Sequence, residues 1–469
     1  MGARDADLVA ARRSLYPAAE RAAARASDAD SVQGAYDAAR DLQEAVRRAG
    51  PVSGGCRPLQ VALGRYAAGR VLQMEGVDRP SASDRAAGRR TAARARAGIA
   101  SAAGRCRGRG GVRAPAPLAM SPGDGEATFG TIVARAPRAA DAATLAVAGQ
   151  AVRSAPVRGG TARFSISGAG RTDLRVAFSR AGRVIGARRA RDVVLLPRSA
   201  LSAVPGSRSD PSLTSSLARA LAGGPRYRAA WVQDLTTGEA AGVNATAAFP
   251  AASTVKLGLM AGSLARLGPA PERTAYADDL RAMITWSSNL ATNRLLRRLG
   301  GTATAADGLR RLGARSSTFT GEYIVGTELQ PALPSGAAGA APPRTSSRVT
   351  TAEDLARMLF SIHAAAAGAP GARGQTGLTA HQARLGLGWL LSSQQRGGNA
   401  SLLSGGASGA SPVAQKNGWI RSARHAAGIV YTPRGPAIAV LLSYDASGVT
   451  LPAARSLGAR VAAIAAALP

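Results

Sequence analysis

The stretch FPAASTVKL, from Phe249 to Leu257, decides how the second half of the chain is interpreted. It places Ser253 three residues before Lys256, at the start of a run with helical periodicity. Positions i and i+3 of a helix share a face, so the Ser253 hydroxyl is expected to point toward the Lys256 ammonium. A lysine that loses its proton on desolvation can activate a serine, and a helix N-terminus offers N–H groups to an oxyanion. The pair therefore predicts a serine nucleophile with a lysine base.

A second motif, Ser287-Ser288-Asn289, lies inside the stretch MITWSSNLATN. Ser287 can relay a proton to a leaving nitrogen, because a hydroxyl both donates and accepts hydrogen bonds. Asn289 can orient either the lysine or a substrate amide. The motif thus supplies the proton transfer that a serine–lysine pair needs to complete an acyl transfer.

A third motif, KNGW, begins at Lys416 on a predicted strand before the final hairpin. Lys416 can hold a substrate carboxylate, and Gly418 lets the backbone approach the substrate closely. Of the 60 lysine and arginine residues, only Lys256 and Lys416 are lysines. Arginine cannot act as a general base, which suggests that lysine is kept where arginine cannot do the same job. Three motifs in this order are more specific than Ser-x-x-Lys alone.

Residues from about 212 to 469 resemble the class A β-lactamase and penicillin-binding serine hydrolase family in these three motifs. The resemblance implies an α/β lobe and an all-α lobe with the site between them. It implies that Ser253 is the acylated nucleophile, Lys256 its base and Ser287 the proton shuttle. The oxyanion hole would be the backbone N–H groups of Ser253 and Trp419. The residues implied to bind substrate are Asn289, Lys416, Asn417, Gly418 and Trp419.

The chain departs from the family pattern at three points. Ser288 replaces an aspartate and Asn417 replaces a threonine or serine, and both replacements are polar. Lactamases of this class use a glutamate on a loop after the Ser-Asp-Asn helix to activate the deacylating water. Glu322 is the candidate by position, but the asparagine expected just after it is absent. Glu322 is therefore either the deacylating base or an ordinary exposed loop acid.

The spacing of apolar residues changes along the chain, which predicts several domains. Residues 1–110 predict a helical bundle, with breaks at Gly50-Pro51 and Arg79-Pro80. Residues 125–197 predict a small β-sandwich, immunoglobulin-like in one interpretation and a β-rich extension of a neighbouring domain in the other. Its expected strands are Thr128–Val133, Thr144–Val147, Ala162–Ile166, Leu174–Phe178 and Val193–Leu196. Residues 212–469 predict an α+β domain whose sheet takes strands from both of its ends.

The amino-acid composition limits the kinds of binding partner that are expected. The net charge is +32, yet arginine is spread along the whole chain together with alanine, glycine and proline, which resembles a GC-rich coding bias. Aromatic residues make up only 4%, too few to stack bases, so nucleic acid is not expected as the main partner. An anionic surface such as a cell wall is compatible with the charge. Three histidines and two cysteines exclude most metal sites, and no cofactor is expected.

The two cysteines, Cys56 and Cys106, form a disulfide in an oxidising compartment or are separate small core residues, and the sequence leaves both open. The sequence contains no apolar stretch of about 18 residues, so no membrane-spanning helix is expected. The charged first residues, MGARDADLVAARRSLYP, are not a signal peptide as written. The family resemblance nevertheless implies an extracellular or cell-wall-associated protein.

Three functions are compatible with these motifs. The leading interpretation is a serine hydrolase that opens a β-lactam amide through an acyl-enzyme at Ser253. The first alternative is a D-alanyl-D-alanine carboxypeptidase-type penicillin-binding protein, whose substrate is a peptidoglycan stem peptide. The second alternative is a cell-wall binding protein that keeps the pocket without turnover.

Overall fold

The structure is a computed structural model that describes residues 3–106, 120–168, 170–197, 207–326, 342, 348–393, 402–407 and 411–468. It divides into two compact units. The first unit contains the N-terminal helices together with Ser288–Arg294 and the loop that begins at Glu322. The second unit contains the remaining β-strands and helices. A short piece of the C-terminal half therefore belongs with the N-terminal helices.

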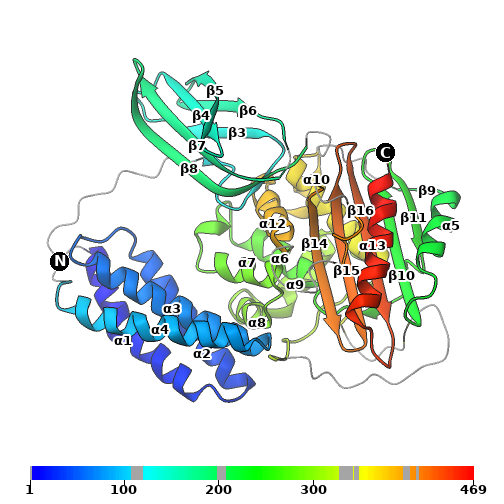
Figure 1. The fold of residues 1–469 in the computed structure, drawn as a ribbon, viewed down its shortest axis with the longest axis horizontal. Helices are drawn as coiled ribbons and strands as arrows, with labels where there is room; N and C mark the ends of the chain where they lie inside the picture. The colour runs from blue at the N-terminus through cyan, green and yellow to red at the C-terminus, as the bar shows by residue number, and fades with distance from the viewer. Residues whose placement is uncertain are drawn as a thin grey trace. The chain divides into compact units, whose positions relative to one another are not determined.

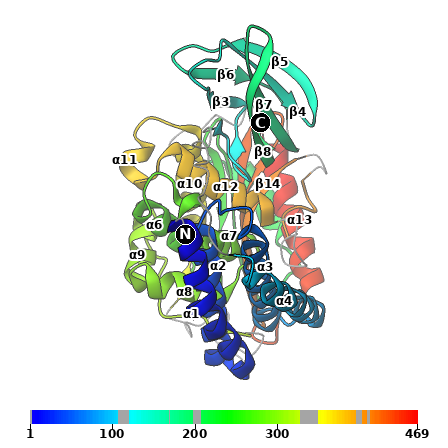
Figure 2. The same cartoon turned by 90° about the vertical axis from the view of Figure 1, so that its left-hand side faces the viewer.

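Four helices of the first unit run side by side, coloured blue in Figures 1 and 2. They are α1 (Ala3–Arg25), α2 (Ala29–Arg48), α3 (Arg57–Asp78) and α4 (Ala82–Ala103). Their core contains fully buried side chains such as Leu42, Leu59 and Tyr66. The predicted helical region is confirmed, and α2 and α3 end just before the two glycine and proline breaks.

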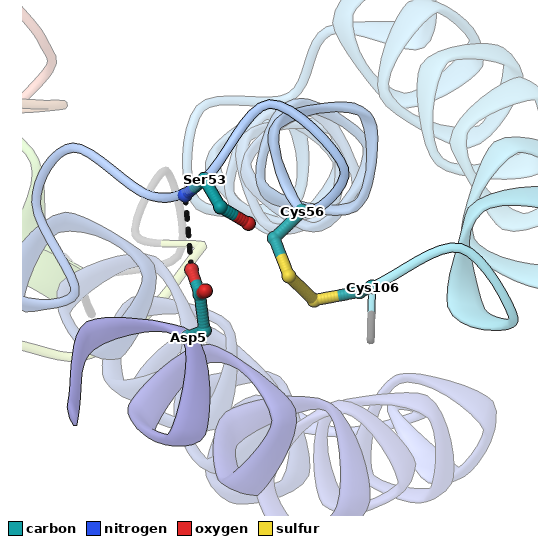
Figure 3. Close-up of a disulfide and its surroundings, with 4 residues drawn as sticks. All are labelled: Asp5, Ser53, Cys56 and Cys106. Carbon is teal, nitrogen blue, oxygen red and sulfur yellow. Dashed lines mark hydrogen bonds between the residues drawn. A yellow bond between two sulfur atoms is a disulfide. The ribbon is translucent and has the colours of Figure 1, made fainter. Parts of the chain in front are cut away.

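A disulfide joins Cys56, the residue before α3, to Cys106, which follows α4 (Figure 3). The sequence left this pairing open. The bond spans a sequence separation of 50 residues. Such a cross-link removes conformational entropy from the unfolded chain and stabilises the fold by about 4 kcal/mol in the chain-entropy model. Close by, the Ser53 N–H donates to Asp5 Oδ1 over 3.0 Å, which holds α1 to the loop before α3 (Figure 3).

The next region forms two sheets, coloured cyan to green in Figure 1. Its strands are β1 (Met120–Ser121), β2 (Ala127–Thr128), β3 (Thr131–Arg135), β4 (Ala142–Val147), β5 (Gln150–Pro156), β6 (Thr161–Ser165), β7 (Gly170–Arg180) and β8 (Arg183–Leu195). One sheet has the order β1-β3-β6 and the other β2-β8-β7-β4-β5. Both contribute to one buried cluster that includes Ile132, Phe164 and Phe178. The immunoglobulin-like form of this region stays a prediction.

One expected strand of this region is wrong. Thr128–Val133 is not continuous, because Gly130 adopts a φ of 89° between β2 and β3. That left-handed conformation favours glycine and breaks the strand. The two pieces then join different sheets. The last strand is also longer than expected, since β8 begins at Arg183.

This β-region contacts the C-terminal part of the second unit through α12 (Ala380–Ser392). Glu126, which is almost fully buried, lies 3.2 Å from His381 Nδ1 and 3.1 Å from Arg384 Nε. Any side chain at Gly388 would overlap the Gly125 carbonyl oxygen. A buried carboxylate with two basic partners and a close backbone approach therefore fix this junction.

The main sheet of the second unit has the order β14-β15-β16-β10-β11-β9. Its strands are β9 (Arg208–Ser209), β10 (Tyr227–Asp234), β11 (Glu239–Val243), β14 (Val413–Ile420), β15 (Ala423–Tyr431) and β16 (Pro436–Tyr444). The early and late strands pair directly, since β10 is antiparallel to β16. The predicted α+β arrangement is confirmed, and the sheet takes in β9, which precedes residue 212.

Helices cover both faces of this sheet. On one face, α5 (Pro211–Ala220) and α13 (Leu451–Ala467) share a buried cluster with sheet residues such as Val430 (Figure 1). Side chains alternate along a strand, and the next residue, Tyr431, contacts His363 of α10 (Ala352–Ala367) on the other face. The remaining elements are β12 (Phe249–Pro250), α6 (Lys256–Arg266), η2 (Pro271–Arg273), α7 (Ala277–Thr285), α8 (Asn289–Arg298), α9 (Gly301–Arg311), β13 (Val349–Thr350) and α11 (Ala372–Thr376). Among the described helices, none is long and apolar enough to span a bilayer.

Candidate active site

Ser253 lies in a tight turn between β12 and α6. The helix begins at Lys256, so the serine precedes it instead of forming its first residue. Ala252 adopts a left-handed φ of 48°, which is uncommon for a residue with a side chain. The Lys256 N–H then donates to the Ser253 carbonyl over 3.3 Å. Residues three apart share one side of such an i to i+3 turn, and the predicted approach of the Ser253 hydroxyl to the Lys256 ammonium stays a prediction.

Lys256 is fully buried at the start of α6. Its Nζ donates to the Ser287 carbonyl oxygen over 2.8 Å and lies 3.5 Å from Ser287 Oγ. An ammonium removed from water needs such acceptors, because burying a charge without a partner is costly. The structure thus brings the predicted base and the predicted proton shuttle together.

Ser287 lies between α7 and α8 in a left-handed conformation with a φ of 63°. This conformation costs energy for a residue other than glycine, and such strain is typical of functional sites. The Ser287 Oγ accepts from Lys416 Nζ over 2.9 Å. The two lysines of the chain, Lys256 and Lys416, therefore approach one hydroxyl group.

Lys416 is buried on β14. Besides Ser287, its Nζ donates to the Asn417 carbonyl over 2.7 Å. Burial lowers the pKa of Lys416 from 10.5 to about 7. Near neutral pH a large fraction of this lysine is consequently uncharged, and an incoming carboxylate would favour its charged form. Its predicted role in substrate binding stays a prediction.

Gly418 brings β14 against the turn of Ser253. A Cβ at this position would lie 2.8 Å from the Ser253 backbone nitrogen and 3.0 Å from the Ala251 carbonyl oxygen. Real Cβ atoms do not approach backbone so closely, so a larger residue would push the strand away. Among the described strands, β14 lies at the edge of its sheet, and Asn417 and Trp419 flank this glycine there. The Trp419 ring packs under Arg424, whose Cζ lies 5.5 Å from the ring centroid.

His425 supports the nucleophile segment and was not expected from the sequence. It lies opposite Gly418 on β15 and is fully buried. The Ser443 N–H donates to its Nδ1 over 3.2 Å, so Nε2 carries the proton and donates to the Pro250 carbonyl over 2.8 Å. Burial lowers the pKa of His425 to about 4, which keeps the ring neutral. A lone histidine on a strand carries no sequence signal that predicts this contact.

The structure places Asn289 and Glu322 in the first unit, with the helical bundle, whereas Ser253 belongs to the second unit. Asn289 is the first residue of α8, and its Nδ2 donates to the Ile324 carbonyl over 3.0 Å. The Glu322 side chain is exposed. The roles predicted for these two residues, like that of the Trp419 N–H, stay predictions.

The sequence of the bundle carries no recognisable catalytic motif, yet its buried acids contact the Ser-Ser-Asn motif. Ser288 Oγ donates to Glu75 Oε1 over 2.7 Å, and the Asn289 N–H donates to Asp78 Oδ2 over 2.8 Å. Glu75 and Asp78 are three residues apart, so they share one helical face. Acidic residues at helical spacing in an arginine-rich bundle were the available signal.

One protein family and several solved structures are similar to this chain. The model of the family described as "Beta-lactamase enzyme family" matches residues 212–269 and 266–468. Among solved structures, the chain is similar to PBP-A, with 19% identity over 55% of this chain and 97% of that chain and a TM-score of 0.42. It is also similar to a β-lactamase from Desulfarculus baarsii, with 17% identity over 54% and 96% of the two chains and a TM-score of 0.42. A third similar structure is an ancestral class A β-lactamase, with 23% identity over 54% and 98% and a TM-score of 0.41. Curated proteins give no match.

The fold is that of a β-lactamase-like serine hydrolase. The matched residues make up more than half of the chain. The chain belongs to the β-lactamase enzyme family.

Proposed function

We propose that the protein is a serine β-lactamase that opens the β-lactam amide through an acyl-enzyme on Ser253. The observation that carries the proposal is the convergence of Lys256 and Lys416 on Ser287 Oγ, beside the turn that carries Ser253. A nucleophile, a base and a proton relay are the parts that an acyl transfer requires.

Acylation would begin at Lys256. In its neutral form this lysine takes the proton of the Ser253 hydroxyl while Ser253 Oγ bonds to the lactam carbonyl carbon. The resulting oxyanion accepts from the backbone N–H groups of Ser253 and Trp419. The carbon–nitrogen bond then breaks, and Ser287 Oγ gives its proton to the leaving nitrogen. Ser287 recovers a proton from a neighbouring lysine, which the 2.9 Å and 3.5 Å separations allow.

Substrate binding would use the β14 side of the site. Lys416 would pair with the carboxylate of the β-lactam, and Gly418 lets β14 lie close to the turn that carries Ser253. Asn417 and Asn289 would supply amide hydrogen bonds. No step of this reaction requires a metal or another cofactor.

Deacylation separates the two enzymatic candidates. If Glu322 activates a water, the acyl-enzyme is hydrolysed and the protein is a lactamase. The alternative, a D-alanyl-D-alanine carboxypeptidase-type penicillin-binding protein, is favoured by two observations. The Glu322 side chain is exposed, and the asparagine that accompanies the family's glutamate is absent. Such a protein would form the same acyl-enzyme with penicillin but release it slowly.

The setting that fits either candidate is outside the cell or at the cell wall. The net charge of +32 suits an anionic wall, and the two-sheeted region would act as a spacer or adhesion module with an immunoglobulin-like sandwich. A third function, cell-wall binding without turnover, uses the same features.

A chromogenic cephalosporin assay run beside a fluorescent-penicillin labelling gel tests the proposal. Turnover with transient labelling supports the lactamase, and stable labelling without turnover supports the peptidase. If neither turnover nor labelling is seen, only the binding function remains. Ser253→Ala should lose both signals, whereas the matched control Ser215→Ala, an exposed serine on α5, should keep them.

A further inference from the structure

Two buried carboxylates of α3 hold the start of α8. Ser288 Oγ donates to Glu75 Oε1 over 2.7 Å, and the Asn289 N–H donates to Asp78 Oδ2 over 2.8 Å. Glu75 is 2% exposed, Asp78 5% and Ser288 0%, so these bonds are made out of contact with water. Burial raises the pKa of Glu75 to about 7, while the hydrogen bond from Ser288 favours its charged form.

These contacts provide hydrogen-bond partners for backbone N–H groups at the start of α8. The first N–H groups of a helix have no partner within it, and carboxylates near them are stabilised by the helix dipole. Ser288 Oγ accepts from the Ala291 N–H over 3.0 Å, which is the bond of an N-cap. Asp78 accepts from the N–H of Asn289, the first residue of α8. The cap of α8 is therefore completed by residues that lie more than 200 positions earlier in the chain.

Helix α2 holds the same segment along its next turn. Gln33 Nε2 donates to the Leu290 carbonyl over 3.1 Å. Arg294, which is almost fully buried, lies 2.7 Å from Asp41 Oδ1. Gln33 and Asp41 are eight residues apart and so lie on one face of α2. The bundle consequently fixes the first two turns of α8 and not only its first residue.

The same unit also fixes the loop that begins at Glu322. The Asn293 side chain accepts from the Tyr323 N–H and donates to the Tyr323 carbonyl, both over 2.8 Å. Asn289 Nδ2 donates to the Ile324 carbonyl over 3.0 Å. The direction of the Asn289 amide is thus set by the main chain of α8 on one side and by this loop on the other.

We propose that Glu75 and Asp78 are positioning residues of the hydrolase site. Ser288 has no carboxylate of its own, and the one that it contacts comes from α3. By holding the Ser288–Asn289 backbone, the two acids set the orientation of the Asn289 amide. The proposal rests on the function proposed above.

Variants of the full chain test this role through the acylation rate constant with a fluorescent penicillin, measured per folded molecule. Glu75→Leu removes the acceptor and should lower the rate constant about tenfold or more. Glu75→Gln keeps an acceptor oxygen and should stay within about threefold of wild type. The control Val46→Ala loosens the bundle core without altering a residue that bonds to α8, so it should acylate like wild type. Equal rates for Glu75→Leu and wild type would overturn the positioning role.

A charge exchange gives a second, independent result. Ser288→Asp places a second carboxyl group against Glu75, whose pKa burial already raises to about 7, and two crowded acids in place of the hydroxyl–carboxylate pair should slow acylation. Adding Glu75→Ser to that variant restores a hydroxyl–carboxylate pair with the partners exchanged, and acylation should recover at least partly. A double variant as slow as Ser288→Asp would contradict the proposal. Failure of the wild-type protein to be labelled would overturn the proposed function and this role together, whereas labelling of wild type and Glu75→Leu at one rate would overturn the role alone.

Discussion

Lys416 Nζ lies 2.9 Å from Ser287 Oγ, and the same hydroxyl lies 3.5 Å from Lys256 Nζ. Two motifs more than 100 residues apart in the chain therefore meet at one oxygen. Because that oxygen can accept from one lysine while it donates its own proton elsewhere, the arrangement is suited to relay a proton. The two lysines nevertheless have different tasks in the proposed reaction, and substitutions can separate them.

Lys256→Arg should be as damaging as Lys256→Ala, while Lys416→Arg should keep part of the activity. The first lysine must give up its proton, which arginine does not do. The second needs positive charge near a carboxylate, which arginine supplies. Acylation rates measured by stopped flow should fall about a hundredfold or more for both Lys256 variants, in the range usual for a general base. Rapid acylation of Lys256→Arg would show that this lysine is not the base.

The burial of Lys416 predicts a pH dependence. Its pKa of about 7 lies below the ordinary value, so the lysine is charged below pH 7 and loses its charge as the pH rises above it. If the charge binds the substrate carboxylate, the second-order rate constant of acylation by penicillin should decline above about pH 7. Lys416→Arg, which stays charged, should lack this decline. A profile that is flat in wild type across pH 6–8.5 would speak against the carboxylate role.

Glu322→Gln distinguishes a deacylating base from a loop acid. If Glu322 activates water, the variant should acylate normally and then accumulate adduct, with each tenfold loss of deacylation equal to about 1.4 kcal/mol of barrier. Burst kinetics with a chromogenic cephalosporin report both steps. Equal deacylation in the variant and wild type would assign this exposed residue no role in the second step.

The junction at His381 should make stability depend on pH. Hydrogen bonds to Glu126 and Glu272 raise the pKa of His381 from 6.5 to about 9. A raised pKa stabilises the folded state fully below pH 6.5, and this stabilisation disappears as the pH rises through about 9. His381→Gln should therefore lower the free energy of unfolding at pH 6, by about 1 kcal/mol after screening by solvent, and change it little at pH 10. Denaturant titrations at the two pH values check this, and an equal loss at both would exclude the ionic contribution.

The three motifs could be recognised in the sequence because their information is local. The spacing of Ser253 and Lys256, and the alternating pattern around Lys416, are visible in a few residues. The break at Gly130 was missed because a glycine inside a β-forming run does not reveal its φ angle. The bond between Glu75 and Ser288 joins positions 213 residues apart, and no local pattern encodes such a pair. Tertiary contacts between distant positions were therefore what the sequence could not provide.

The central claim is that Ser253 is acylated, and intact-mass spectrometry after incubation with benzylpenicillin tests it most directly. Wild type should gain the mass of one penicillin molecule, because ring opening adds the whole molecule to the serine without a leaving fragment. Where hydrolysis is fast, short incubation times or Glu322→Gln should capture the adduct. Ser253→Ala should gain nothing while keeping its circular-dichroism spectrum and melting temperature. An adduct of equal yield on the folded Ser253→Ala protein would contradict the claim.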